Sequence, residues 1–124
     1  MPKFTLHDLE KRVKARAKKR GKAGAEPSYT RKLLDRGVAQ CAKKLGEEAV
    51  ETVLAAVNES RGRLIAETAD LIYHLLVVLQ ARGIAFAQVE AALAKRTKQS
   101  GLEEKASRRP GARKIKRRSR RARR

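Results

Sequence analysis

This chain contains two clusters of acidic residues, five residues in all, whose types and spacing could form a metal-binding or catalytic site. The first cluster is Glu47, Glu48 and Glu51, and the second is Glu67 and Asp70. Successive residues of a helix turn by about 100°, so each cluster falls on one side of its helix. Carboxylate oxygens gathered in this way bind hard divalent cations. The residue types therefore predict a metal site, with Mg²⁺ as the expected ion and Mn²⁺ as the alternative.

The second cluster lies in an unusually apolar stretch. From Leu64 to Leu79 the chain reads LIAETADLIYHLLVVL, which is apolar nearly all round a helical wheel and predicts a mostly buried helix. Buried carboxylates are costly unless they are paired, neutralised or metal-bound. Because the first cluster would repel the second, a divalent cation is the expected partner of both. The alternative is that Glu47, Glu48 and Glu51 form only a solvated charged face.

Two long helices are expected to hold the clusters. One runs from about Val38 to Val57, with a wide apolar stripe opposite the acids. The turn from Asn58 to Gly62 is short enough to force an antiparallel return into the second helix, which Gly83 ends. Folding at this turn brings Glu51 and Glu67 to similar heights. The two clusters should therefore face each other near the middle of a helical hairpin.

Three shorter helices complete the prediction. An amphipathic helix near the N-terminus should continue into the basic run from Lys14 to Arg20, and Ser28 should cap a helix from Tyr29 to Arg36. A last amphipathic helix is expected from Ile84 to about Thr97. Aromatic residues make up 3% of the chain and Trp is absent, which agrees with helices. We predict an all-α fold, a small helical bundle with two long antiparallel helices.

The formal charge of +19 is concentrated at the two ends of the chain. Residues 1–25 carry nine Lys and Arg against two acids, residues 26–107 carry twelve against eleven, and residues 108–124 carry eleven against none. A segment of that last composition cannot bury enough apolar surface to order itself. We expect an all-α domain over residues 1–107 and a disordered basic tail over residues 108–124, which would bind nucleic acids only nonspecifically.

The cysteine content, the lack of a long apolar run and the histidine spacing each exclude a class of protein. The single cysteine, Cys41, excludes an internal disulfide, and neither a membrane span nor a leader is expected, so we predict a cytoplasmic protein. A di-iron bundle would need Glu-x-x-His pairs, which neither cluster has. His74 follows Asp70 by four residues, so it is expected either to orient that carboxylate or to fill a buried polar position, and in neither role to bind the metal. Tyr73, beside it, is also expected to support the site.

At these motifs the sequence resembles the phosphoribosyl-ATP pyrophosphatases of histidine biosynthesis, within the all-α, MazG-like nucleoside-triphosphate pyrophosphohydrolases. The superfamily signature is Glu-Glu-x-x-Glu followed by Glu-x-x-Asp, and it matches the two acidic clusters. The resemblance runs from about Phe4 to Arg108. The narrower features are Ser28-Tyr29-Thr30, Lys44, Gly46, Asp70-Leu71-Ile72-Tyr73-His74, Val89, Arg96 and Glu103-Glu104-Lys105-Ala106-Ser107-Arg108.

The resemblance implies hydrolysis of 1-(5-phosphoribosyl)-ATP to 1-(5-phosphoribosyl)-AMP and pyrophosphate. In this interpretation the bound cation neutralises the triphosphate and lowers the pKa of a bound water. Glu47 would orient or deprotonate that water. The expected metal ligands are Glu48, Glu51, Glu67 and Asp70.

Contacts to the substrate are expected from a different part of the chain. Ser28, Tyr29 and Thr30 stand at a helix start, where backbone N–H groups and hydroxyls can receive a phosphate, although a plain helix cap explains the same residues. Lys44 would offset charge on a phosphate, although an ion pair with Glu48 is the alternative.

Two further expectations concern partners and competing functions. Two long helices and a few short ones give a thin core, so a homodimer that completes the bundle is expected. A housekeeping pyrophosphatase for aberrant nucleotides is the first alternative function. A nucleic-acid-binding protein is the second, but the interleaved aromatics and groove-reading motif of such proteins are missing.

Overall fold

The computed structural model describes residues 3–18, 28–58 and 60–98. These ranges contain five α-helices and no strand, so the predicted all-α fold is confirmed. The expected basic tail, residues 108–124, and the domain boundary at residue 107 lie outside the described residues and stay predictions. The helices are α1 (Leu6–Lys18), α2 (Tyr29–Asp35), α3 (Val38–Asn58), α4 (Arg61–Ala81) and α5 (Phe86–Thr97).

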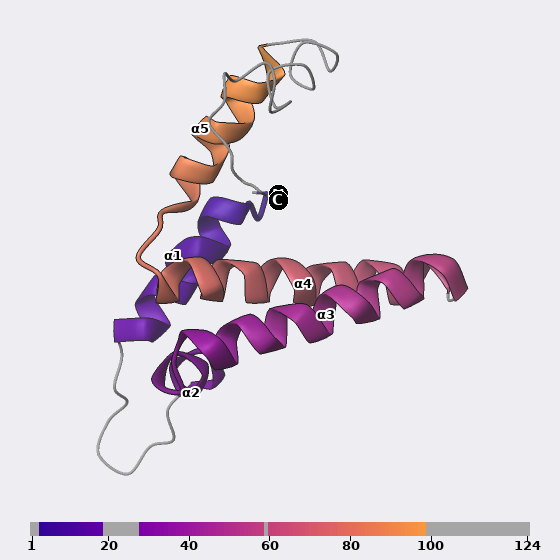
Figure 1. The fold of residues 1–124 in the computed structure, drawn as a ribbon, viewed down its shortest axis with the longest axis horizontal. Helices are drawn as coiled ribbons and strands as arrows, with labels where there is room; N and C mark the ends of the chain where they lie inside the picture. Colours follow the sequence, from indigo (N-terminus) through magenta and orange to yellow (C-terminus); the bar gives the residue numbers. More distant parts are fainter. Residues whose placement is uncertain (1–2, 19–27, 59, 99–124) are drawn as a thin grey trace, which may run out of the picture. The chain divides into compact units, whose positions relative to one another are not determined.

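Helices α3 and α4 form a long antiparallel hairpin (Figure 1). Each has 21 residues, which corresponds to about 30 Å of helix. Ser60 caps α4, because its hydroxyl accepts a hydrogen bond from the backbone N–H of Arg63 at 3.2 Å. Helix α4 therefore begins at Arg61, inside the segment predicted as a turn.

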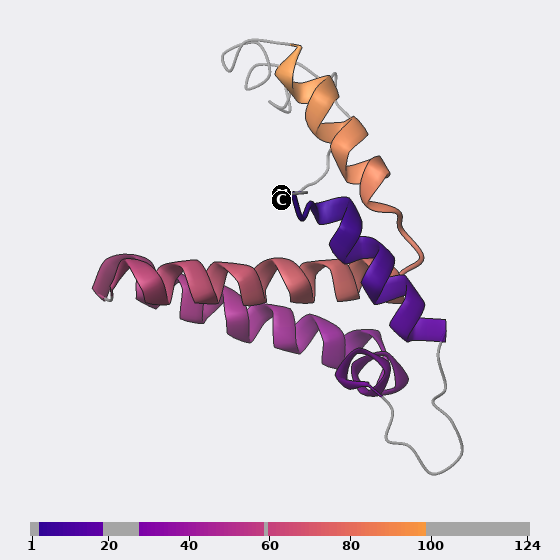
Figure 2. The same ribbon diagram turned by 180° about the vertical axis from the view of Figure 1, so that it is seen from behind.

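Helices α1 and α2 pack on the end of the hairpin where α3 begins and α4 ends (Figures 1 and 2). Ser28 caps α2 as predicted, accepting from the backbone N–H of Arg31 at 3.0 Å. Gly37 then turns the chain into α3 with a φ of 95°, a conformation that side chains with a Cβ rarely adopt. Most of the buried apolar side chains lie at this end: Val13, Leu33, Cys41, Leu76, Val77 and Phe86.

Helix α5 continues from α4 through a short connection. Gly83 ends α4 with a φ of 69°, as the sequence predicted. The described residues up to Phe86 belong to one compact unit, and those from Ala87 onward belong to a second. Within its own unit α5 is a mostly exposed helix, with Leu93 at its surface.

The turn end of the hairpin leaves apolar side chains uncovered. Val57 on α3 is 72% exposed and Ile65 on α4 is 61% exposed. The expectation of a mostly buried second helix is therefore wrong for the single chain. The physical reason is that a two-helix hairpin buries one stripe of each helix, while α1 and α2 cover only the opposite end. Val50, Val53 and Leu54 of α3 are also exposed, and Leu75 is exposed nearer the other end of α4.

By length and composition alone, α4 could also cross a membrane. That test is weak evidence for a span, because the core helix of a soluble protein passes it too. Glu67 and Asp70 stand near the middle of α4, where charged groups are expensive in a bilayer. These two acidic residues weigh against a membrane span formed by α4.

The core end of the hairpin gives a test of this architecture. Val77 is completely buried, so Val77→Ala removes two methyl groups from a packed site and leaves a cavity. We expect the free energy of unfolding to fall by about 2 kcal/mol. Urea denaturation followed by circular dichroism measures it, with exposed Leu93→Ala as the control. An equal loss in both variants would mean that Val77 does not lie in the core.

Candidate metal centre

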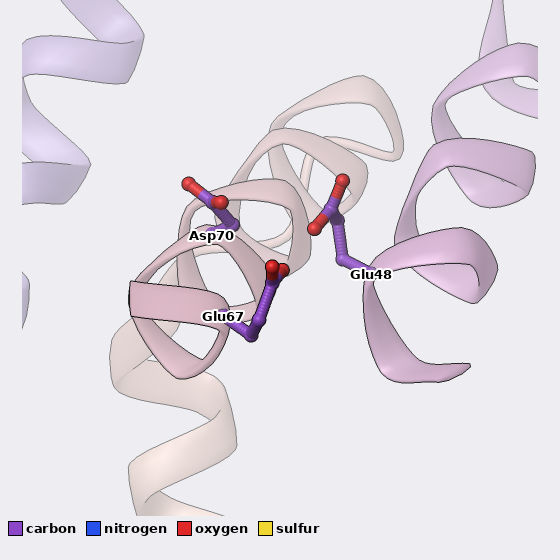
Figure 3. A group of neighbouring side chains, drawn as sticks. All are labelled: Glu48, Glu67 and Asp70. Carbon is purple, nitrogen blue, oxygen red and sulfur yellow. The ribbon is translucent and has the colours of Figure 1, made fainter. Parts of the chain in front are cut away.

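Three carboxylates meet where α3 faces α4. Glu48 projects from α3 toward Glu67 and Asp70 of α4 (Figure 3). One oxygen of each lies within 4.8 Å of the others. Oxygens that share a cation at about 2.1 to 2.5 Å can be at most about 4 to 5 Å apart, so this spacing is compatible with a common ion. The donor set, three carboxylate oxygens, suits a hard divalent cation that keeps water in its remaining positions.

The three carboxylates differ in their surroundings. Glu67 is buried, with 7% of its surface exposed, whereas Glu48 is half-buried and Asp70 is exposed. The expected burial of both α4 acids is therefore correct for Glu67 and wrong for Asp70 in the single chain. Asp70 lies three positions after Glu67 on the helix, and the resulting rotation turns Asp70 away from the stripe that packs on α3. The cluster consequently has a buried floor and an open side.

Thr52 links the two helices at the level of the carboxylates, and the sequence analysis did not find it. Its hydroxyl donates to the backbone oxygen of Glu48 at 2.8 Å and lies 3.1 Å from the backbone oxygen of Glu67. A single hydroxyl proton is thus shared between α3 and α4. This contact holds the backbones of two cluster residues side by side. Its position four residues after Glu48 was the available sequence signal.

Arg63 is the second residue that the sequence analysis missed. It lies one helical turn before Glu67, and its guanidinium donates to Glu67 Oε2 at 2.6 Å. The buried carboxylate therefore has a cationic partner from its own helix. The sequence signal was the four-residue spacing of an Arg and a Glu, which places both on one face.

Glu51 and Glu47, two further predicted site residues, are placed differently. Both are exposed, and neither belongs to the group of three carboxylates. Glu47 instead forms an ion pair with Lys44, whose Nζ lies 2.9 Å from Glu47 Oε1. The alternative partner weighed for Lys44 was Glu48, so the observed pairing is with a different residue of the same cluster.

The Lys44–Glu47 pair shifts the pKa of both groups. The hydrogen bond from Lys44, followed by its positive charge, lowers the pKa of Glu47 below its ordinary value. The same hydrogen bond and the charge of Glu47 raise the pKa of Lys44. Glu47 is therefore held ionised, and Lys44 is held protonated.

Two hydrogen bonds join the start of α2 to α4. The hydroxyls of Thr30 and Tyr73 are bonded to each other, and the hydroxyl of Tyr29 lies 3.4 Å from His74 Nε2. Burial raises the pKa of Tyr73, so its hydroxyl stays protonated. Tyr73 and His74, predicted to support the acidic site, thus fasten α2 to the hairpin.

His74 contacts Asp70 through the backbone and not through the carboxylate. Its Nδ1 lies 2.9 Å from the backbone oxygen of Asp70, which can only accept, so Nδ1 carries a proton. When the ring is neutral, Nε2 accepts from the hydroxyl of Tyr29. Of the two roles considered for His74, the observed contacts are those of a satisfied buried polar residue.

The residues predicted to bind substrate have unequal access. Tyr29 is about half exposed, whereas Thr30 is almost completely buried and its hydroxyl is already bonded to Tyr73. The Ser28 hydroxyl caps α2, as the alternative interpretation of these residues requires. In this structure Tyr29 is thus the side chain of the three most open to an incoming molecule.

Comparison with known proteins gives matches along most of the chain. The model of the phosphoribosyl-ATP pyrophosphohydrolase family matches residues 6–97. A protein named phosphoribosyl-ATP pyrophosphatase 1 from Bradyrhizobium diazoefficiens is 66% identical over 108 residues, which cover 87% of this chain and 98% of the relative. Its namesake from Rhodopseudomonas palustris is 61% identical, with 87% and 97% covered. A phosphoribosyl-ATP pyrophosphatase from Nitrobacter hamburgensis is 59% identical, with 87% and 97% covered.

The ion pair beside the cluster gives a test of the site's electrostatics. Lys44→Met removes both the hydrogen bond and the charge that lower the pKa of Glu47. We expect that pKa to rise toward the ordinary glutamate value, measured by following the Glu47 side-chain carbon with NMR during a pH titration. Lys43→Met is the control, because the charge of Lys43 is a smaller cause of the shift. An unchanged pKa in Lys44→Met would contradict the pairing.

Proposed function

This chain belongs to the phosphoribosyl-ATP pyrophosphohydrolase family, and from that premise we propose that it hydrolyses 1-(5-phosphoribosyl)-ATP to 1-(5-phosphoribosyl)-AMP and pyrophosphate. The reaction is a step of histidine biosynthesis. The predicted family and enzyme class are confirmed by the family match and by relatives that are 53% to 66% identical. The observation in the structure that supports the activity best is the meeting of Glu48, Glu67 and Asp70.

Metal dependence follows from the chemistry of these side chains. We propose that Glu48, Glu67 and Asp70 hold a divalent cation, with Mg²⁺ as the physiological ion and Mn²⁺ as a substitute. Glu51 is proposed as a fourth ligand, recruited by a change of side-chain rotamer, because it lies three residues after Glu48 on the same helix. Once bound there, the cation would neutralise charge on the polyphosphate and would lower the pKa of a water molecule that it holds.

Glu47 and Lys44 are proposed to act on the water and the phosphates. Water attacks the α-phosphorus, a new P–O bond forms, and the α,β-anhydride bond breaks to release pyrophosphate. Glu47 accepts the proton that the water loses, which requires an ionised carboxylate, and its lowered pKa supports that state. Lys44 is held protonated and offsets charge on the phosphates.

Recognition of the substrate is proposed to come from the start of α2. Tyr29 has the exposure needed for direct contact. Ser28 and Thr30 are proposed to act on the same substrate group, and Thr30 also holds the helix in place through Tyr73. The hydroxyl groups of these residues, together with the ammonium group of Lys44, can bind the extra phosphate that distinguishes this substrate from ATP.

The oligomeric state and the location of the protein are also part of the proposal. We propose a cytoplasmic homodimer in which the exposed apolar side chains at the turn end of the hairpin pack against a second copy. Val57 and Ile65 lie in this area, and exposed apolar area of that kind is typical of an interface. Nonspecific binding of nucleic acids through residues 108–124 remains a proposal from charge alone.

The proposed activity can be tested with one ligand variant. Asp70→Asn replaces a negatively charged metal ligand with a neutral one at an exposed position. Turnover with Mg²⁺ should therefore fall by about a hundredfold or more while helicity is retained. Product analysis by chromatography with phosphoribosyl-ATP measures the loss. Asp35→Asn, an exposed carboxylate on α2, is the matched control.

The same assay separates the competing functions. Wild-type protein should convert phosphoribosyl-ATP to phosphoribosyl-AMP and pyrophosphate in preference to a panel of dNTPs. Efficient cleavage of dNTPs without cleavage of phosphoribosyl-ATP would favour the housekeeping pyrophosphatase. Full activity of Asp70→Asn at saturating Mg²⁺ would contradict the proposed metal ligands.

The proposed dimer has its own test. Val57→Glu places a charge in the exposed apolar area and should convert a dimer into a monomer, measured by light scattering after size-exclusion chromatography. Leu93→Glu on α5 is the control, because it adds the same charge at an exposed leucine of the other unit. A dimer that persists in Val57→Glu but not in Leu93→Glu would place the interface elsewhere.

A further inference from the structure

Arg63 is the cationic group bonded to the buried member of the carboxylate cluster. Its guanidinium donates to Glu67 Oε2 at 2.6 Å, and the two side chains are 53% and 9% exposed. A buried carboxylate needs a partner, and Arg63 provides one. The cluster of three acids is thus partly neutralised by a residue of its own helix.

Three properties of this pair indicate that a divalent cation would replace Arg63 at Glu67. A guanidinium bonded to a metal ligand lies close to the ion and is repelled by it. The half-exposed side chain of Arg63 can swing into water, where its charge is solvated, whereas the Glu67 side chain is held in a buried position. In addition, the basic residue precedes the acidic one along the helix, which is the weaker order for a pair four residues apart.

We propose that Arg63 is an internal counter-ion of the metal centre. It holds Glu67 while no cation is bound and is displaced when a divalent cation binds. Only molecules in which the ion pair is open can bind the cation. The apparent affinity for the cation is therefore the intrinsic affinity multiplied by the fraction of such molecules. This inference rests on the proposed function, because it takes Glu48, Glu67 and Asp70 to be the metal ligands.

The test is the binding of Mn²⁺ without nucleotide, measured by electron paramagnetic resonance of the free ion. Arg63→Gln removes the competing charge at a half-exposed position, so we expect Mn²⁺ to bind about three- to tenfold more tightly than to the wild type. Arg61→Gln, which removes a charge two residues away on the same helix, should change the affinity by less than about twofold. Thermal unfolding gives a second readout, in which added Mn²⁺ should stabilise Arg63→Gln more than the wild type.

Weaker or unchanged binding of Mn²⁺ to Arg63→Gln would overturn the proposal, since weaker binding would mean that Arg63 orients Glu67 for the ion. An equal gain in Arg61→Gln would overturn it as well, because the effect would then be one of general charge. Asp70→Asn separates this proposal from the proposed function. If Asp70→Asn binds Mn²⁺ like the wild type, or the wild type binds none, the metal centre itself is wrong. If Asp70→Asn loses binding and only Arg63→Gln has no effect, the metal centre stands and the counter-ion does not.

Discussion

The antiparallel packing of α3 on α4 brings together carboxylates that repel one another, and the other features of the site depend on this constraint. Glu48 and Glu67 come from different helices, so they meet only while the hairpin is closed. The side chains around them reduce the cost of the repulsion: Arg63 bonds to Glu67, and Thr52 ties the two backbones together. The folded hairpin therefore stores an electrostatic cost that a divalent cation can relieve.

The start of α2 depends on the same hairpin. Tyr29 and Thr30 are bonded to His74 and Tyr73 of α4, so the residues proposed to meet the substrate are placed by the helix that carries two of the acids. Because His74 also contacts the backbone of Asp70, a movement of this part of α4 would displace both the carboxylate cluster and the start of α2. The two parts of the proposed site are thus mechanically connected through one turn of helix.

The sequence predicted those features that depend on local chemistry. Ser28 begins α2 and Gly37 and Gly83 follow the ends of helices, because caps and positive φ angles are properties of a few neighbouring residues. The acidic clusters were recognisable by spacing, and Glu48, Glu67 and Asp70 do lie together. Tertiary contacts were harder to predict: the partners of Thr52 and Arg63, and the exposure of Asp70, follow from the rotation of one helix against another, which periodicity alone does not determine.

The uneven cover of the hairpin has a consequence for its internal motions. Val77 and Cys41 are almost completely buried, whereas Val57 and Ile65, nearer the turn, are largely exposed. In the isolated chain, backbone amides should therefore exchange with solvent slowly at the covered end and progressively faster toward the turn. The carboxylate cluster lies between these two ends, near the middle of both long helices. An ion that bridges α3 and α4 there would stop the opening from spreading inward, so the proposed metal centre would also stabilise the closed hairpin.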